Sequence, residues 1–180
     1  METIIVKNQK ELDAIKEDDD VRIEIRNAEE EIKIKKEYKE SVCVYGSSKV
    51  YAYESSIVNA HESSKVYAFG SSLINATGSS VVYAHGSSVV CAHESSKVYA
   101  FESSVVCAHE SSKVSAYESS VVCAHGSSKV YAYGSSLISA FGLSVVYAYE
   151  SSKVYAYESS VIHAHGSNKV IDKRPKLKKA

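Results

Sequence analysis

The sequence contains no long apolar run and no basic leader at its start. Met1 to Val6 lack the basic region that opens a signal peptide, and no later stretch is apolar over the length that a bilayer requires. We therefore expect a cytoplasmic protein without a membrane association. A Gly-rich phosphate-binding loop and the nucleophile elbow of many hydrolases are missing as well.

Cysteines are few, and the residue types that often act in catalysis are not placed uniquely. The four cysteines, Cys43, Cys91, Cys107 and Cys123, do not resemble the framework of a small disulfide-rich domain, so we expect reduced thiols. Ser, His and Glu recur at equivalent places along the chain, whereas an active site needs one unique constellation. The sequence predicts a protein that is not an enzyme, with no catalytic residue and no cofactor.

What the sequence does contain is one octapeptide, Ser-Ser-x-Val-x-Ala-x-(Glu/Gly), repeated fifteen times over residues 47–166. We label its positions a to h, starting at Ser47. Position b is always Ser, d is Val or Ile, and f is Ala. Because side chains alternate between the two faces of a strand, b, d and f share one face, and this small face is the predicted interior. Glu or Gly at h, followed by Ser at a, supplies a turn.

The outward positions show that two octads make one repeat. At position e, alternate octads carry mostly Tyr, as at Tyr51 and Tyr67, whereas the intervening octads carry Asn and then Cys. The true period is therefore sixteen residues. This predicts an all-β fold, a parallel β-solenoid whose sixteen-residue coils form two stacked parallel sheets. With neighbouring strands ~4.8 Å apart, residues 47–166 would be roughly 35–40 Å long.

The repeat is flanked by two shorter regions. Residues 1–46 are predicted to form a small N-terminal α/β cap that covers the open backbone groups of the first coil. Its predicted elements are a strand over residues 3–6, a helix from Asn8 to about Glu17 that begins with a capping box to Glu11, and strands over residues 21–25 and 32–34. Residues 39–46 already fit the octad.

Residues 167–180 form the C-terminal end and a basic tail. They carry one acidic and six basic side chains, whereas residues 1–46 carry thirteen acidic and nine basic ones. The tail either seals or leaves the end of the rod, and a weak, nonspecific contact with nucleic acid is the only role for nucleic acid that the sequence allows.

One outer face of the predicted rod is aromatic, with a row of lysines beside it. Stacked rings pair readily across strands, so this ladder has a purely structural explanation, but Tyr is also favoured at interfaces. The candidate interface residues of this aromatic ladder are Tyr51, Tyr53, Tyr67, Phe69, Tyr83, Tyr99, Phe101, Tyr117, Tyr131, Tyr133, Tyr147 and Tyr149.

The other outer face carries an apolar row next to rows of Cys and His. A contiguous exposed apolar strip usually marks a contact with a partner. Its candidate interface residues are Val89, Cys91, His93, Val105, Cys107, His109, Val121, Cys123 and His125. Cys and His on adjacent coils also raise the alternative of a tetrahedral metal site, although ligands on a flat sheet point in parallel directions; no metal ligand is assigned. A row of imidazoles would resist simultaneous protonation, which predicts pH-sensitive association.

The octad Ser-Ser-Lys-Val-Tyr-Ala-Tyr-Glu resembles the Ala-Gly-Tyr-Gly-Ser-Thr-x-Thr octads of bacterial ice-nucleation proteins, which also pair into sixteen-residue coils with a Tyr ladder. It is more similar to the Ser-Ala-Thr-Val-x-Ala-Tyr-Gly arrays of octapeptide-repeat proteins of phage and bacteria, some of which carry a cap resembling residues 1–40. The resemblance covers about 120 residues. It implies a β-solenoid and, from the phage arrays, an intracellular accessory protein that binds and blocks a host factor.

Two classes of function follow. The first is a non-enzymatic interaction or scaffold protein, a homodimer or other homo-oligomer, that binds a protein partner through its flat ladder faces. The second is an ice-binding protein that orders water, which the absence of outward Thr-x-Thr rows disfavours, since Thr77 is the only Thr of the array. A metal-binding Cys/His ladder is a third alternative.

Overall fold

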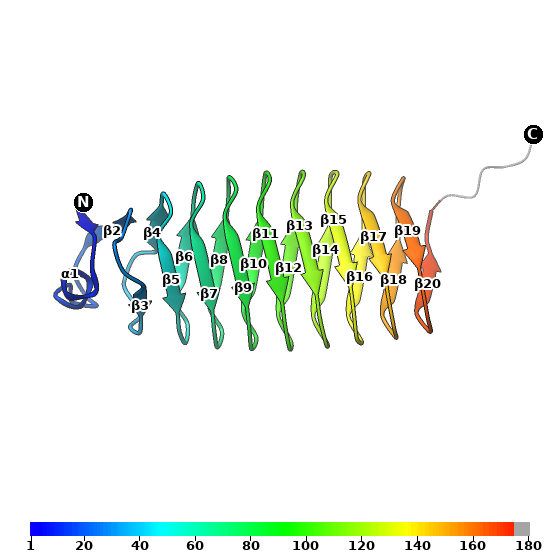
Figure 1. Cartoon of the computed structure of the whole chain (residues 1–180), viewed down its shortest axis with the longest axis horizontal. Helices are drawn as coiled ribbons and strands as arrows, with labels where there is room; N and C mark the ends of the chain where they lie inside the picture. Colours follow the sequence, from blue (N-terminus) through cyan, green and yellow to red (C-terminus); the bar gives the residue numbers. More distant parts are fainter. Residues whose placement is uncertain (175–180) are drawn as a thin grey trace, which may run out of the picture.

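Each octad forms one four-residue strand that runs from position c to position f, because the β-branched residue at d and the alternating burial favour an extended backbone. The computed structural model describes residues 1–174 and shows these strands wound into a rod (Figure 1). The predicted parallel β-solenoid is confirmed. With neighbouring strands about 4.8 Å apart, the larger sheet is about 48 Å long.

Two parallel sheets line the rod, and consecutive octads alternate between them. Sheet A contains, in order, β1 (Glu2–Val6), β2 (Val21–Arg26), β4 (Val42–Tyr45), β6 (Ile57–Ala60), β8 (Leu73–Ala76), β10 (Val89–Ala92), β12 (Val105–Ala108), β14 (Val121–Ala124), β16 (Leu137–Ala140), β18 (Lys153–Ala156) and β20 (Lys169–Asp172). Sheet B contains β3 (Ile32–Ile34), β5 (Lys49–Ala52), β7 (Lys65–Ala68), β9 (Val81–Ala84), β11 (Lys97–Ala100), β13 (Lys113–Ala116), β15 (Lys129–Ala132), β17 (Val145–Ala148) and β19 (Val161–Ala164).

From β4 and β5 onward, neighbouring strands pair in register with an offset of sixteen residues. Cys91 lies beside Cys107 in sheet A, and Tyr67 lies beside Tyr83 in sheet B. Identical octad positions therefore stack into continuous rows along the rod. This register confirms the coil of two octads.

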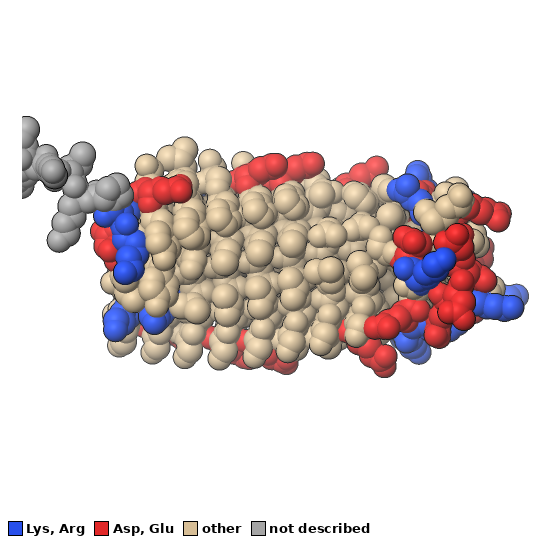
Figure 2. Space-filling view, turned by 180° about the vertical axis from the view of Figure 1, so that it is seen from behind, with Lys and Arg blue, Asp and Glu red and all other residues tan. Residues whose placement is uncertain are grey.

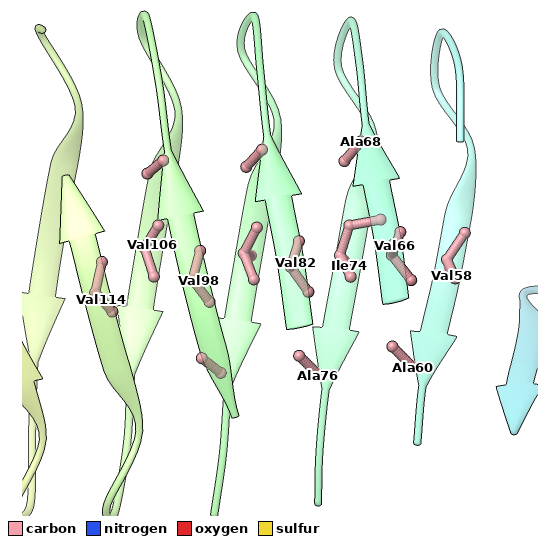
Figure 3. Packing of buried hydrophobic residues seen from close by; sticks show 14 of the residues in the cluster. Val58, Ala60, Val66, Ala68, Ile74, Ala76, Val82, Val98, Val106 and Val114 are labelled. Atoms are coloured by element: carbon pink, nitrogen blue, oxygen red, sulfur yellow. The ribbon is translucent and has the colours of Figure 1, made fainter. Parts of the chain in front are cut away.

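The interior consists of the small residues at b, d and f. The Val or Ile side chains at d and the Ala side chains at f, from Val50 to Ala156, are at most 1% exposed, and Figure 3 shows them meeting between the two sheets. Each buried Val contributes roughly 1.5–3 kcal/mol of hydrophobic stabilisation. The core is narrow, and no interior position of the array accommodates a side chain larger than Ile.

The inward Ser hydroxyls are mostly bonded to the turns. At ten of the fifteen coil corners the Ser at b donates to the carbonyl of the residue three positions earlier, as Ser56 Oγ does to Tyr53 O at 2.6 Å. The five hydroxyls without a partner among the described residues belong to Ser64, Ser80, Ser112, Ser128 and Ser144. All five precede strands of sheet B, so this corner is the less well satisfied of the two.

The residue at h turns the chain in the left-handed conformation. Gly adopts this conformation without strain and occupies h in seven of the fifteen octads, but the other eight carry Glu with φ between 53° and 58°. Six of the eight carboxylates accept a hydrogen bond from a backbone N–H group of the preceding coil, as in Gly86 N to Glu102 Oε2 at 2.6 Å and Glu94 N to Glu110 Oε2 at 2.9 Å. These bonds between coils offset the backbone strain of a non-Gly residue at the turn.

The N-terminal end is sealed by its cap. The helix α1 (Gln9–Asp13) begins as predicted, with Asn8 Oδ1 accepting from Glu11 N at 3.0 Å. It ends at Asp13 and not near Glu17, because Ile15 N–H donates to Leu12 O in a tighter turn. The Gln9 side-chain amide donates to Lys33 O and accepts from Lys33 N, at 3.0 and 2.7 Å. A side chain thus occupies the edge of β3 where another strand would pair.

Among the described residues, the C-terminal end is less covered. The ladder continues beyond the recognisable repeat, since β20 pairs with β18. Inward positions of the last coil lose their cover, and Val170 is 39% exposed. Arg174 pairs with Asp172 at 2.6 Å and donates to Ser160 O at 3.1 Å. The rest of the basic tail, residues 175–180, lies outside the described residues.

Candidate interaction surfaces

The tyrosine face is the outer surface of sheet B, formed by positions c, e and g of its octads. At position e, Tyr51, Tyr67, Tyr83 and Tyr99 stack with ring centroids 4.7–4.8 Å apart and ring planes within 12° of parallel. The spacing follows from the in-register strands, which place identical rings one strand apart. The predicted aromatic ladder is confirmed as a structure, and its role as an interface stays a prediction.

A second row of rings, at position g, forms one edge of the tyrosine face. Its centroid distances lie between 4.7 and 5.5 Å. The row is unbroken and consists of Tyr53, Phe69, His85, Phe101, Tyr117, Tyr133, Tyr149 and His165. This row makes a continuous aromatic wall beside the tyrosines at position e.

Lysines at position c form the other edge of the tyrosine face. The Nζ atoms of Lys49 and Lys65 lie 4.9–5.3 Å from the centroids of neighbouring Tyr rings, within range of cation–π attraction. Lys49 is also ion-paired with Glu31, and hydrogen bonding to this carboxylate raises the pKa of Lys49. Farther along, Lys97, Lys113 and Lys129 stand on three successive strands.

The row at position e has one missing rung. Ser115 lies between Tyr99 and Tyr131 in the strand register. All the remaining strands of sheet B from β5 to β17 carry Tyr at position e. A recess of about 240 Å³ opens at this point. It is lined by Lys97, Val98, Tyr99, Lys113, Ser115 and Tyr131. The substitution is visible in the sequence, but the recess appears only when the neighbouring rungs are placed.

The valine–cysteine face is the outer surface of sheet A from β6 to β16. Its row at position c, consisting of Ile57, Leu73, Val89, Val105, Val121 and Leu137, is contiguous in the strand register. Ile57 is 47% and Leu73 is 37% exposed, and the other four are partly exposed. Figure 2 shows a face whose charged side chains gather at the two ends and along the edges, which leaves the middle uncharged.

The cysteines of the valine–cysteine face are free thiols. Cys91, Cys107 and Cys123 stack on adjacent strands and are partly exposed. Burial, with the neighbouring Cys107 as a further cause, raises the pKa of Cys91 and of Cys123, so both favour the protonated thiol. Within residues 1–174, no group of three or more His, Cys, Asp or Glu side chains is arranged to hold a metal ion.

Imidazoles form the row at position g of the valine–cysteine face. His93, His109 and His125 stack at 4.8 and 5.3 Å, and Phe141 and Tyr157 continue the row. Burial lowers the pKa of His109, and the flanking His93 and His125 lower it further. The middle ring of this row therefore favours the neutral form.

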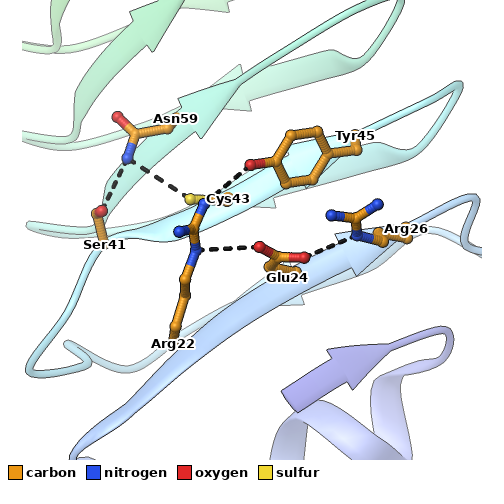
Figure 4. A network of polar contacts seen from close by, with 7 residues as sticks. All are labelled: Arg22, Glu24, Arg26, Ser41, Cys43, Tyr45 and Asn59. Carbon is orange, nitrogen blue, oxygen red and sulfur yellow. Dashed lines mark hydrogen bonds and ion pairs between the residues drawn. The ribbon is translucent and has the colours of Figure 1, made fainter. Parts of the chain in front are cut away.

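An ion-pair network lies on the outer surface of sheet A near its N-terminal end, on β2 and β4 (Figure 4). Glu24 is 6% exposed and accepts from Arg22 Nε and Arg26 Nε at 3.0 and 2.7 Å. Arg22 also donates to the Tyr45 hydroxyl at 3.1 Å. This network was not predicted from the sequence, although the Arg-x-Glu-x-Arg alternation in β2 was a visible signal.

Side-chain amides follow on the next strands of sheet A. Asn59 Nδ2 donates to Ser41 Oγ at 2.8 Å, and Asn75 Nδ2 donates to Asn59 Oδ1 at 2.9 Å. Asn59 Nδ2 also lies 3.8 Å from Cys43 Sγ, so Cys43, Asn59 and Asn75 are linked along the outward row that continues to Cys91.

No family model, curated protein or solved structure matches this chain. Its function is therefore inferred from the two faces. Within the described residues, no helix has the length and apolar character needed to cross a membrane.

Proposed function

We propose that the protein is a non-enzymatic interaction scaffold that self-associates through its valine–cysteine face and presents its tyrosine face to a protein partner. The observation that carries the proposal is the uncharged aliphatic row from Ile57 to Leu137, which lies open along a flat sheet. Monomeric proteins rarely expose a contiguous apolar strip of this extent. Two copies of a straight row can lie against each other over their whole length.

The tyrosine face suits a different contact. Its rings offer a large, stiff surface with hydroxyl groups at the rim, and its lysines disfavour a symmetric contact with a second copy of themselves. The resemblance of the octad to arrays in phage and bacterial proteins supports an accessory role in which this face binds and blocks a host protein. The ice-ordering alternative gains no support from either described face, since Thr77 is held by His61 at 3.0 Å.

Self-association is tested by replacing the centre of the aliphatic row. In the Val89→Lys, Val105→Lys, Val121→Lys variant, three ammonium groups would stand on successive strands. The fold tolerates this arrangement on sheet B, where Lys97, Lys113 and Lys129 do the same. We expect the wild-type protein to be a dimer and the triple variant a folded monomer, measured by light scattering together with circular dichroism.

A matched control adds the same charge elsewhere. Ser95, Ser111 and Ser127 are exposed corner residues, so their replacement by Lys leaves both faces unchanged. This control is expected to remain a dimer. A monomeric wild-type protein, or a triple variant that stays a dimer, would contradict self-association through the valine–cysteine face.

A further inference from the structure

The missing rung of the tyrosine ladder has the dimensions of one aromatic ring. Adjacent rings at position e are 4.7–5.1 Å apart elsewhere in the row. Tyr99 and Tyr131 are separated by two strand spacings, or about 9.6 Å. A flat ring placed midway would lie about 4.8 Å from each of them, within the range in which aromatic pairs attract. The aromatic ring of a bound ligand would therefore take the place of the missing Tyr ring and complete the row.

The chemistry at the floor and sides of the recess selects the kind of ring. Ser115 is partly exposed at the bottom, and its hydroxyl can donate to or accept from a polar ring edge. The stacked pair Phe101 and Tyr117, at 5.0 Å, belongs to the aromatic wall on one side. On the other side stand Lys97 and Lys113, both exposed and both lining the recess.

Positive charge is concentrated at this part of the tyrosine face. Lys97, Lys113 and Lys129 follow one another, whereas Val81 and Val145 occupy the same row on either side. Neither Lys97 nor Lys113 has an ion pair among the described residues. Nearby carboxylates lie at the corners, where Glu94, Glu102 and Glu110 accept from backbone amides of the preceding coil. Glu118 lies at the corner that follows Tyr117, on the side of the aromatic wall opposite to the lysines.

We propose that the recess at Ser115 binds a small planar aromatic anion, whose ring stacks between Tyr99 and Tyr131 and whose anionic group meets Lys97 and Lys113. A mononucleotide has this chemistry, because a flat base carries a phosphate within reach of its edge. Stacking accounts for the position of the ring, and the two ammonium groups account for the charge. The inference is independent of self-association, which concerns the opposite face.

Calorimetric titration of the full chain tests the site with adenosine monophosphate as the probe and adenosine as its neutral counterpart. We expect one site per chain for the nucleotide and binding at least about fivefold weaker for adenosine, because adenosine lacks the group that meets the lysines. The Lys97→Ala, Lys113→Ala variant should bind the nucleotide about as weakly as the wild-type protein binds adenosine.

Ser115→Tyr is the decisive variant, because it fills the recess with the residue that the row uses elsewhere. Binding should weaken by about tenfold or more, while the melting temperature stays equal or rises, since the ladder becomes complete. Tyr67→Ser, made in the Ser115→Tyr background, opens a new recess between Tyr51 and Tyr83 beside Lys49 and Lys65. It should restore part of the binding.

Two results would overturn the proposal. One is a wild-type protein that fails to bind the nucleotide up to ~10 mM. The other is a Ser115→Tyr variant that keeps its fold and binds the nucleotide as tightly as the wild type, which would place the contact elsewhere on the chain.

Discussion

The two outer faces of the rod are built on the same interior and yet differ in almost every chemical respect. Both sheets place Ser, Val or Ile, and Ala inside at the same register. Outside, sheet B carries stacked tyrosines beside lysines, whereas sheet A from β6 to β16 carries aliphatic residues, amides and thiols without a charged side chain. The inner rows therefore determine the coil, and the outer rows vary without altering it.

Single rungs illustrate this independence. Ser115 interrupts the tyrosines, and Val145 and Lys153 exchange the residues usual for their sheets, yet the strands at these places pair in the common register. A flat sheet face tolerates such changes because each outward side chain contacts mainly its two neighbours in the row. The fold thus restricts the residue type strictly at inward positions and only weakly at the outward positions of both faces.

The largest expected effect comes from breaking the inside position of one strand. Ala108 is fully buried and Cys107, its neighbour in β12, points outward. Ala108→Leu should overpack the narrow core and reduce the free energy of unfolding by about 3 kcal/mol. Cys107→Leu, the control, should change it by less than about 0.5 kcal/mol. Chemical denaturation measures both, and equal effects would refute the assignment of the two sides.

A smaller effect is expected from pH, and it concerns the row of imidazoles on the valine–cysteine face. The pKa of His109 is lowered in the folded protein, so near and below the ordinary value of 6.5 the unfolded chain binds more protons at this residue. The stability contributed by the neutral ring is complete above this value. It is lost as the pH falls toward the lowered pKa of the folded protein.

The melting temperature of the wild-type protein should accordingly decrease as the pH is lowered from 7.5 to 5.5. Replacement of His93, His109 and His125 by Tyr, the residue common on the opposite face, should reduce this dependence. The remaining histidines, His61, His85, His163 and His165, are unchanged in the variant and provide the background. An identical pH profile for the two proteins would show that the row does not carry the effect.

The smallest effect is expected in the reactivity of the thiols. Because the pKa of Cys91 and of Cys123 is raised, and because thiolate is the reactive form, both should react with iodoacetamide more slowly in the folded protein than in urea. Mass spectrometry of the labelled peptides resolves the individual sites. Folded-state rates as fast as those in urea would contradict the burial of these thiols.

The fold was largely predictable, but the ends and corners were not. Inward Val50 and Ala52, the sixteen-residue register and the stacked tyrosines followed from the repeat, since the environment of one coil recurs in every other. The helix in the cap begins where the capping box predicted but ends at Asp13, before the predicted end near Glu17. Contacts such as Gln9 with Lys33 involve parts of the chain that occur once and are far apart in sequence.

The candidate surfaces show the same division. The sequence placed the aromatic, aliphatic, Cys and His rows on their faces, because a strand exposes every second residue. It did not reveal that Glu at position h bonds an amide of the preceding coil, or that Arg22 and Arg26 neutralise Glu24 at the end of sheet A. These contacts depend on side-chain reach between coils.

The sequence by itself determined the solenoid, its two-octad coil and the residues of each face. A repeat of sixteen residues buries its small side chains in every coil only when equivalent positions of successive coils lie beside one another. The tertiary structure alone decided which contacts seal the N-terminal end, which Ser hydroxyls find a partner, and that the rung without Tyr leaves a recess beside two lysines. Those features depend on the distances between side chains on neighbouring coils, and such distances exist only once the coils are stacked.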